Sequence, residues 1–387
     1  MKRIDLIYFE AGGGHRAAAT ALNLVFARQG RPWDTRLVNL QELLDPIDVF
    51  RKLFGVRLQD VYNLLLRRGW TLGSSHLCGL MHAAIRASHP QQLRLLEEHW
   101  RASRPDLVVS LVPNFNRALC ESLKNVLPGS PLVTVLTDLA DYPPHFWIER
   151  QDQFLVCGSD RAVEQAREQG YSDERIFRTS GMILHPRFYD PVTANRAAER
   201  RRLGLDPDRT TGLVLFGGEG SKAMLKIALR LDHSGLPLQL IFICGRNAAL
   251  ADELRALPTR IPKFVEGFTS EVPFYMHLAD FFIGKPGPGS ISEALAMRLP
   301  VIVQCNAWTL PQERYNAEWV RRNRVGLVVR EFHHIGDAVK RLIEPATLAD
   351  YRAAASALEN RAVFEVPEIL ERILNFRTAS RVSPTGP

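Results

Sequence analysis

A glycine-rich turn with a histidine, close to the N-terminus, is the first segment that could do chemistry. Gly12, Gly13, Gly14 and His15 follow the apolar run 4–9 and precede a helix-like stretch. Glycines let a backbone approach a substrate closely, and a helix start offers free N–H groups to an anion. His15 could therefore take the proton of an acceptor hydroxyl as a general base. A tight turn with an exposed histidine would show the same residues.

A second glycine-rich turn, FGGEGSK, lies in the second half of the chain. Gly217, Gly218 and Gly220 repeat the order of apolar run, glycine turn and helix. Backbone N–H groups of such a turn can cradle a diphosphate. The spacing is not that of a P-loop, so this turn by itself is weak evidence.

The third glycine-rich segment, GKPGPGSISEA at 284–294, carries the most specific pattern. Its predicted site residues are Lys285, Gly287, Gly289, Ser290 and Glu293. The glycines and the serine are predicted to open a helix toward a phosphate. The carboxylate is predicted in the first turn of that helix, where it could accept hydrogen bonds from ribose hydroxyls. An ordinary helix start would explain the glycines but not the lysine and the glutamate together.

Two shorter segments supply further polar side chains. Gln312, Glu313 and Asn316 begin a predicted helix and could read sugar hydroxyls through paired hydrogen bonds. Asp138 ends the apolar run 132–137, where it could orient the histidine or bind the acceptor. A capping role for Asp138 in the next turn is equally compatible with the pattern.

Two parallel sheets are needed to position these turns. Short Val/Ile/Leu runs alternate with amphipathic helices, which is typical of parallel strands covered on both faces. The predicted strands are 4–9, 36–39, 106–112, 132–137, 153–156, 213–216, 238–244, 264–266, 280–283, 300–304 and 326–329. We therefore expect an α/β chain with one doubly wound sheet in each half.

Domain limits follow from breaks in this alternation. The proline-containing stretch 182–196 places the boundary near residue 190, with a second domain at 191–363. The tail 377–387, rich in Ser, Thr, Pro and Gly, is expected to be disordered.

Composition limits the possible partners. The 387 residues carry a net charge of +7, which suits an anionic partner. That charge is spread along the chain without a nucleic-acid-binding motif, so we expect no nucleic acid. Five scattered cysteines are typical of reduced thiols. The stretch 48–86 mixes apolar and basic residues, as in a helix lying on an anionic membrane or in an inserted helical pair packed on the sheet.

Taken together, these segments resemble the GT-B glycosyltransferases. The similarity is to the monogalactosyldiacylglycerol synthases, the processive diacylglycerol glucosyltransferases and, more distantly, the N-acetylglucosaminyltransferase that forms lipid II. It rests on GGGHRAAA (12–19), VLTDL (135–139), KPGPGSISEAL (285–295) and QERYNA (312–317). The chain departs from the synthases at 9–11 and at 141–147, segments that bear on the acceptor.

The resemblance implies two Rossmann-like domains facing across a cleft, with a last helix at about 364–376 returning to the first domain (1–190). It implies that His15 is the base, that the glycine turns and Lys285 hold the UDP diphosphate, and that Glu293 binds the ribose. It also implies that the pair Gln312 and Glu313 reads the sugar.

The expected reaction is inverting transfer of a hexose from UDP-galactose or UDP-glucose to diacylglycerol or a similar lipid, giving a β-glycolipid. The alternatives are a UDP-GlcNAc transferase acting on a polyprenyl-linked acceptor and a non-catalytic protein that binds nucleotide sugars. We expect no metal or other cofactor. The expected location is cytoplasmic, peripheral on the inner face of the plasma membrane, with the stretch 48–86 on the anionic lipid surface.

Overall fold

The computed structural model describes residues 1–10, 13–47, 82–83, 85–141 and 145–382. The described residues before 187 and from 361 onward form one compact unit, and residues 187–360 form a second. Gly12 and nearly all of the stretch 48–86 lie outside the described residues, and so do 383–387. The predictions made for those residues therefore stay predictions.

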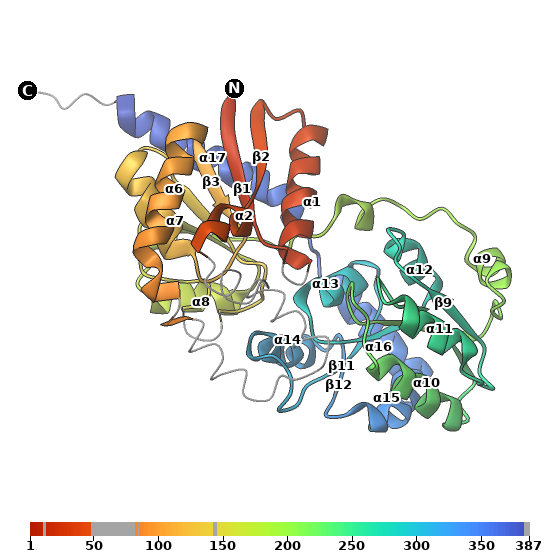
Figure 1. The fold of residues 1–387 in the computed structure, drawn as a ribbon. Coiled ribbons are helices and arrows are strands. Elements are labelled where there is room, and N and C mark those ends of the chain that lie inside the picture. The colour runs from red at the N-terminus through yellow and green to blue at the C-terminus, as the bar shows by residue number, and fades with distance from the viewer. Residues whose placement is uncertain (11–12, 48–81, 84, 142–144, 383–387) are drawn as a thin grey trace, which may run out of the picture. The chain divides into compact units, whose positions relative to one another are not determined.

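Unit 1 is built on a six-stranded parallel sheet (Figure 1). In spatial order its strands are β2 (Trp33–Asn39), β1 (Lys2–Tyr8), β3 (Leu107–Ser110), β4 (Leu132–Val135), β5 (Phe154–Cys157) and β6 (Ile176–Arg178). Every residue of β3, β4 and β5 is buried, because helices cover both faces of the sheet. The edge strand β6 was not predicted, since its three residues are too few to form a recognisable apolar run.

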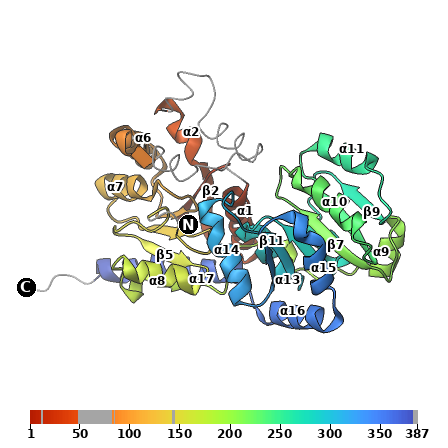
Figure 2. The same ribbon diagram turned by 90° about the horizontal axis from the view of Figure 1, so that it is seen from below.

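Two groups of helices cover that sheet. They are α1 (Gly14–Arg28), α2 (Leu40–Leu44), α6 (His89–Ser103), α7 (Asn116–Val126), α8 (Asp160–Glu168) and α17 (Ala362–Val382). The apolar faces of α2, α6 and α7 form one core with β1 and β3, centred on Trp100. Helix α17 packs against α1, and Figure 2 shows α17 on the opposite side of the sheet from α6 and α7.

Helix α17 corrects one prediction. Its residues 377–382 belong to the tail that was expected to be disordered. The sequence there has no helix breaker before Pro384, so backbone hydrogen bonding can continue past Phe376.

Unit 2 repeats the same plan. Its sheet is β12 (Gly326–Val329), β11 (Val301–Gln304), β10 (Phe281–Gly284), β7 (Thr210–Leu215), β8 (Leu238–Ile243) and β9 (Lys263–Glu266), all parallel. Its helices are α9 (Arg196–Arg202), α10 (Ala223–His233), α11 (Ala248–Ala256), α12 (Val272–Leu278), α13 (Pro288–Ala296), α14 (Pro311–Arg322), α15 (Ile335–Leu342) and α16 (Pro345–Ala357). Apolar side chains of α10, α11 and α15 form the core on one face of this sheet.

The strand orders locate the place where each unit can bind a ligand. In unit 1 the chain leaves β1 for β2 on one side and later returns to β3 on the other. In unit 2 the same reversal lies between β7 and β10. Crevices form at the carboxyl ends of strands at such switch points. The glycine turns after β1, β7 and β10 all lie there, and the predicted doubly wound α/β fold is confirmed.

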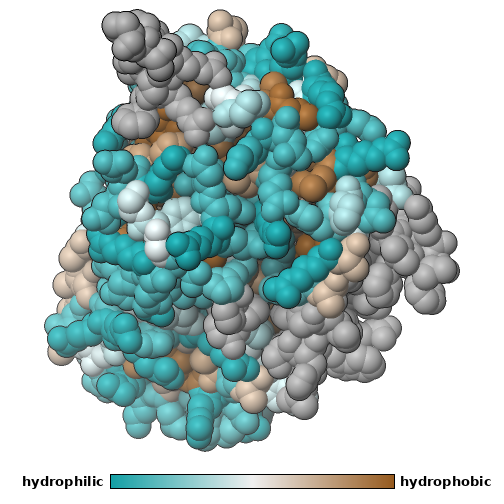
Figure 3. Space-filling view, turned by 90° about the vertical axis from the view of Figure 1, so that its left-hand side faces the viewer, coloured by the Kyte–Doolittle hydropathy of each residue, from teal (hydrophilic) through white to brown (hydrophobic). Residues whose placement is uncertain are grey.

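None of the helices in the described part of the chain combines the length and the apolar character that crossing a bilayer requires. On the face shown in Figure 3, hydrophilic residues predominate and apolar ones are scattered among them.

Candidate active site

The first glycine turn places His15 in the first turn of α1. Gly13 caps this helix with a φ of 77°, a conformation that side chains other than glycine rarely adopt. A Cβ at Gly14 would meet no atom within 4 Å, so a ligand can approach the backbone there. No side chain caps the helix start, which leaves its N–H groups available to an anion or a hydroxyl oxygen.

His15 as a residue is partly exposed, but its ring is enclosed by aromatic and polar neighbours. Its Nδ1 lies 3.1 Å from the Thr137 hydroxyl, which can donate or accept and so suits either tautomer. The ring centroid lies 6.3 Å from that of Phe9 and 5.9 Å from that of Trp147. Burial lowers the pKa of His15 to about 4, against an opposing hydrogen bond to the Leu111 backbone. The imidazole is therefore neutral near pH 7 and can accept a proton.

Asp138 lies in the same cluster and forms a hydrogen bond to a different ring. Its Oδ2 accepts from the indole Nε1 of Trp147 at 2.9 Å. Through this bond the carboxylate fixes the tryptophan that lies beside His15. The predicted alternatives for Asp138, orienting the histidine or binding the acceptor, stay predictions; in the structure the side chain hydrogen-bonded to the imidazole is Thr137.

The loop that carries Trp147 is held by a buried carboxylate that the sequence analysis missed. Asp141 accepts hydrogen bonds from the backbone N–H groups of Trp147 (2.7 Å), His145 (3.1 Å) and Ile148 (3.4 Å). Burial raises the pKa of Asp141, although these three bonds act in the opposite direction. Asp141 could have been suspected because it follows the VLTDL segment by two residues.

A second histidine borders this site. His82 Nε2 lies 2.8 Å from Oδ1 of Asn114, in the loop after β3. Asn114 has a φ of 68°, and its N–H donates to the Phe146 carbonyl at 2.7 Å. Non-glycine residues in this conformation are uncommon and cluster at functional sites. Neither residue was predicted, because their proximity depends on chain segments 32 residues apart.

In unit 2, the turn after β7 is locked to the turn after β8. The N–H of Arg246 donates to the Gly218 carbonyl at 2.8 Å. A Cβ on Gly245, whose φ is 59°, would lie 2.2 Å from the same oxygen. Glycine is therefore required at Gly245, a residue that the sequence analysis missed although it too follows a buried strand. Gly217 and Gly220 also have positive φ values, of 74° and 61°.

One predicted diphosphate donor has a structural partner. The N–H of Gly220 donates to the Gly217 carbonyl at 3.3 Å, which closes the turn. In this arrangement Gly220 shapes the loop, and the predicted diphosphate cradle stays a prediction.

The turn after β10 leads into α13 with its N-terminus open. Gly287 caps the helix without a side chain, and Pro288 is its first residue. Gly289 is exposed, and a Cβ there would meet no atom within 4 Å in the described part of the chain, so a ligand has room to approach. The predicted phosphate-facing residues Gly287, Gly289 and Ser290 thus share one helix start with free N–H groups.

Glu293 lies one turn later than predicted. Because Pro288 starts the helix, Glu293 is its sixth residue and falls in the second turn. Burial alone raises the pKa of Glu293 to about 7. Within the described part of the chain no hydrogen bond or ion pair to this carboxyl is present, so it is a polar group available to a ligand.

The predicted sugar-reading residues meet the phosphate loop. Glu313, only 10% exposed, accepts a hydrogen bond from Lys285 Nζ at 2.9 Å. Asn316 is fully buried and donates to the Pro286 carbonyl at 2.8 Å. Gln312 is partly exposed at the second position of α14. The structure therefore brings the start of α14 and the turn 285–287 into direct contact.

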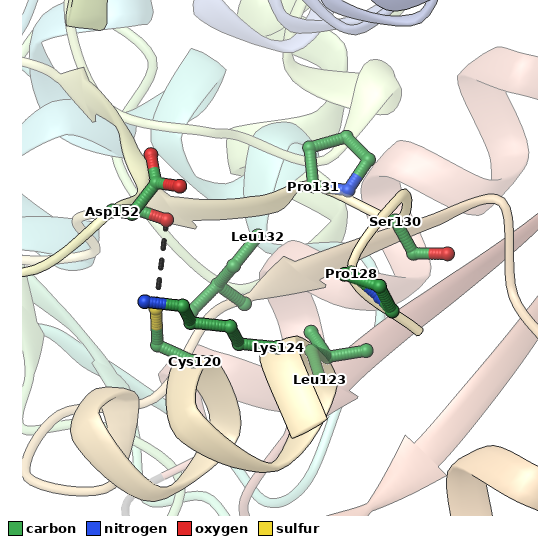
Figure 4. Close-up of a pocket in the computed structure, with 8 residues that line it drawn as sticks. All are labelled: Cys120, Leu123, Lys124, Pro128, Ser130, Pro131, Leu132 and Asp152. Atoms are coloured by element: carbon green, nitrogen blue, oxygen red, sulfur yellow. Dashed lines mark hydrogen bonds between the residues drawn. The ribbon is translucent and has the colours of Figure 1, made fainter. Parts of the chain in front are cut away.

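A small pocket elsewhere in unit 1 is not a candidate site. It lies at the amino end of β4, lined by Cys120, Lys124, Ser130, Leu132 and Asp152 (Figure 4). Its volume of about 30 Å³ holds no more than a water molecule. His15 lies at the carboxyl edge of the same sheet, so this pocket is separate from the turns described above.

Known proteins resemble this chain in sequence. Residues 213–373 match the glycosyltransferase family 28 C-terminal domain. Monogalactosyldiacylglycerol synthase of Spinacia oleracea is 26% identical over 96% of this chain and 73% of its own length. Monogalactosyldiacylglycerol synthase 1 of Arabidopsis thaliana is 28% identical over 89% of this chain and 66% of its length.

Solved structures share the fold at low sequence identity. Acinetobacter baumannii MurG superposes with a TM-score of 0.64 at 13% identity, over 96% of this chain and 100% of that one. The calicheamicin glycosyltransferase CalG4 superposes with a TM-score of 0.61 at 16% identity, over 96% and 99%. These likenesses confirm the GT-B architecture. The chain is a hexosyltransferase of the GT-B fold that is similar to the monogalactosyldiacylglycerol synthases and whose residues 213–373 match the glycosyltransferase family 28 C-terminal domain.

Proposed function

We propose that this enzyme transfers a hexose from UDP-galactose or UDP-glucose to the free hydroxyl of diacylglycerol or a similar membrane lipid. The product would be a β-glycolipid, formed with inversion at the anomeric carbon. The names of its relatives support the galactolipid reaction. The observation that carries the proposal is His15, an imidazole held neutral at the switch point of unit 1.

On the acceptor side, His15 acts as the general base. In the tautomer with the proton on Nδ1, the Thr137 oxygen accepts that proton's hydrogen bond and Nε2 takes the proton of the attacking hydroxyl. The lipid oxygen bonds to the anomeric carbon as the bond to the UDP oxygen breaks. The aromatic rings of Phe9 and Trp147 limit water near the imidazole and suit an apolar acceptor.

On the donor side, backbone N–H groups neutralise the leaving diphosphate. The turn after β7 and the start of α13 supply these groups, and Lys285 adds a positive charge. Glu293 binds the ribose, while Gln312 and Glu313 face the hexose. Asn316 was predicted to join them, but it is fully buried and instead ties α14 to the Pro286 carbonyl. We propose that no metal or other cofactor takes part, because helix N-termini and a lysine can carry the charge of UDP.

The acceptor places the enzyme at a membrane surface. We propose that it binds the inner face of the plasma membrane peripherally, through the basic and apolar stretch 48–86. An excess of seven positive charges supports attraction to anionic lipids.

A transfer assay tests the proposal. The full chain is mixed with diacylglycerol in anionic vesicles and given radiolabelled UDP-galactose, UDP-glucose or UDP-GlcNAc. We expect labelled glycolipid from a hexose donor, a loss of at least about 100-fold in His15→Ala, and unchanged UDP binding. His333→Ala, which alters an exposed histidine of unit 2, is the matched control.

Three other outcomes would contradict the proposal in different ways. In a parallel assay with a polyprenyl-linked acceptor in place of diacylglycerol, transfer from UDP-GlcNAc alone would support the first alternative. UDP binding without transfer from any donor would support a non-catalytic nucleotide-sugar protein. Full activity in His15→Ala would remove the base assignment.

A further inference from the structure

The side chain of Lys285 lies between two glycine turns and the first turn of α14. Its Cε is 3.8 Å from the position of a Cβ on Gly217 and 3.3 Å from that of a Cβ on Gly287. Its Nζ is 2.9 Å from Oε1 of Glu313. One ammonium group therefore borders both turns that would hold a diphosphate and also bonds to a side chain predicted to read the hexose.

The Glu313 carboxylate is buried, and its orientation depends on this contact. The side chain is 10% exposed, whereas that of Lys285 is 43% exposed. A buried carboxylate is costly without a charged or hydrogen-bonding partner. A carboxylate has two acceptor oxygens, so the ion pair through Oε1 leaves Oε2 able to accept from a hydroxyl.

A second contact fixes the same two segments from the other side. Asn316 Nδ2 donates to the Pro286 carbonyl at 2.8 Å, one turn further along α14. The turn 285–287 and the start of α14 are thus joined by two bonds, one of them ionic. A displacement of the turn 285–287, called the phosphate turn below, would therefore move the Glu313 side chain.

We propose that Lys285 is a positioning residue for hexose recognition: it holds the Glu313 carboxylate in place and makes binding of the hexose depend on the phosphate turn. This inference rests on the proposed function, in which the donor is a UDP-hexose. It differs from a simple phosphate contact. A lysine that only bound phosphate would strengthen UDP and UDP-hexose equally, whereas a positioning lysine adds to the affinity that the hexose contributes.

The test measures that hexose contribution directly. Calorimetry gives the Kd of UDP, UDP-galactose and UDP-glucose for the wild type, Lys285→Met, Glu313→Gln and the double variant. The readout is the ratio of the UDP Kd to the UDP-hexose Kd. We expect each single variant to lower this ratio about tenfold. The double variant should lower it no further, because both substitutions remove the same interaction between Lys285 and Glu313.

Two controls separate positioning from general damage. Lys226→Met removes an exposed lysine of α10 and should leave the ratio unchanged. Lys285→Arg keeps a cation and should restore part of the ratio, while thermal melting checks that each variant is folded. An unchanged ratio in Lys285→Met, additive losses in the double variant, or no hexose contribution in the wild type would overturn the inference. If these Kd ratios change among the variants as expected but no glycolipid is made in the transfer assay, the result would count against the proposed function alone.

Discussion

At the scale of single residues, two ionisable side chains at the carboxyl edges of the two sheets have pKa values that are shifted in favour of their neutral forms. Burial lowers the pKa of His15 to about 4 and raises the pKa of Glu293 to about 7. Both shifts follow from removing water around a group that lacks a charged partner. Groups displaced in this way cluster at functional sites, which agrees with the placement of both at switch points.

The first prediction concerns the pH dependence of transfer. A base must be unprotonated. At saturating UDP-hexose, where titration of Glu293 no longer limits donor binding, kcat/KM for the lipid acceptor should stay constant above about pH 5 and fall roughly tenfold per pH unit below about 4, the pKa of His15. Trp147→Ala admits water beside the ring and should move this acid limb toward 6.5, the pKa of an exposed histidine. Trp147→Phe keeps an aromatic ring and should move the limb less. A wild-type limb near pH 6.5 would contradict the environment described for His15.

The second prediction concerns Glu293 and stability. Because its pKa is raised in the folded state, from 4.5 to about 7, the folded protein binds more protons than the unfolded one between these values. Its contribution to stability is therefore lost as pH rises from 4.5 to 7. Glu293→Gln should raise the free energy of unfolding by about 1–3 kcal/mol at pH 8 and hardly at pH 4.5. Urea denaturation at the two pH values measures this difference.

The same variant should bind the ribose more weakly. An amide has one acceptor oxygen where the carboxylate has two, so a ribose diol loses a partner. Calorimetry with uridine is the measurement, because uridine has no phosphate that titrates near neutral pH. Tighter binding by Glu293→Gln would show that the carboxyl does not meet the ribose.

The sequence allowed His15 to be chosen because a histidine in a glycine turn after an apolar run is a local pattern. The neighbours of His15 could not be predicted in this way, because they are distant from it in the sequence. Thr137 is 122 residues away, and its hydroxyl reaches the ring only because β1 and β4 end at the same edge of one sheet. The neutral state of His15 also could not be predicted, since burial by Trp147 depends on the loop that Asp141 ties down.

At the scale of elements, the glycines of unit 2 divide into two kinds. Gly245 is needed by the fold, because its φ is positive and a Cβ would overlap the Gly218 carbonyl. Gly289 has open space around it and an ordinary φ, so the fold does not require it. A glycine in such a turn can thus be required by the fold or can leave room for a ligand. The sequence pattern alone does not distinguish these two roles.

This difference gives a third prediction. Gly245→Ala should destabilise the protein by about 2–4 kcal/mol, from backbone strain and the displaced turn. Gly289→Ala should leave stability equal or slightly higher, since alanine is the better helix residue by about 0.5–1 kcal/mol. It should nevertheless weaken UDP binding, because the methyl group occupies the approach to the helix start. Thermal melting and UDP titration of both variants separate the effects, and equal losses of stability would show that the distinction is wrong.

Most elements could be predicted because parallel strands form continuous apolar runs. The predicted ends of some helices and strands were less accurate than their existence, because single residues or strand pairing determine where an element begins. Pro288 begins α13 and so shifts Glu293 into the second turn. Strand β2 begins at Trp33, three residues before the predicted start, because pairing with β1 continues through charged residues.

At the scale of the whole molecule, the donor site is contained in one continuous segment. Every residue assigned to UDP or the hexose lies within 187–360, and this segment has its own core around α10, α11 and α15. Unit 1 is different, because it needs residues from both ends of the chain.

A fourth prediction follows from this division. The isolated segment 187–360 should fold cooperatively and bind UDP with a Kd within about tenfold of that of the full chain, since its size is typical of an independent domain. Calorimetry and a denaturation curve are the measurements. A folded segment that fails to bind UDP would show that unit 1 contributes to the nucleotide site.

The packing of α17 on α1 has a consequence for how the protein is made. Helix α1 leaves the ribosome early, but α17, which packs against it, is synthesised only after the whole of unit 2. Unit 2 can therefore complete its fold during translation, whereas unit 1 must wait until α17 has emerged. A premature stop codon after residue 360 would thus harm the half of the enzyme that carries His15, although the missing segment is more than 340 positions away.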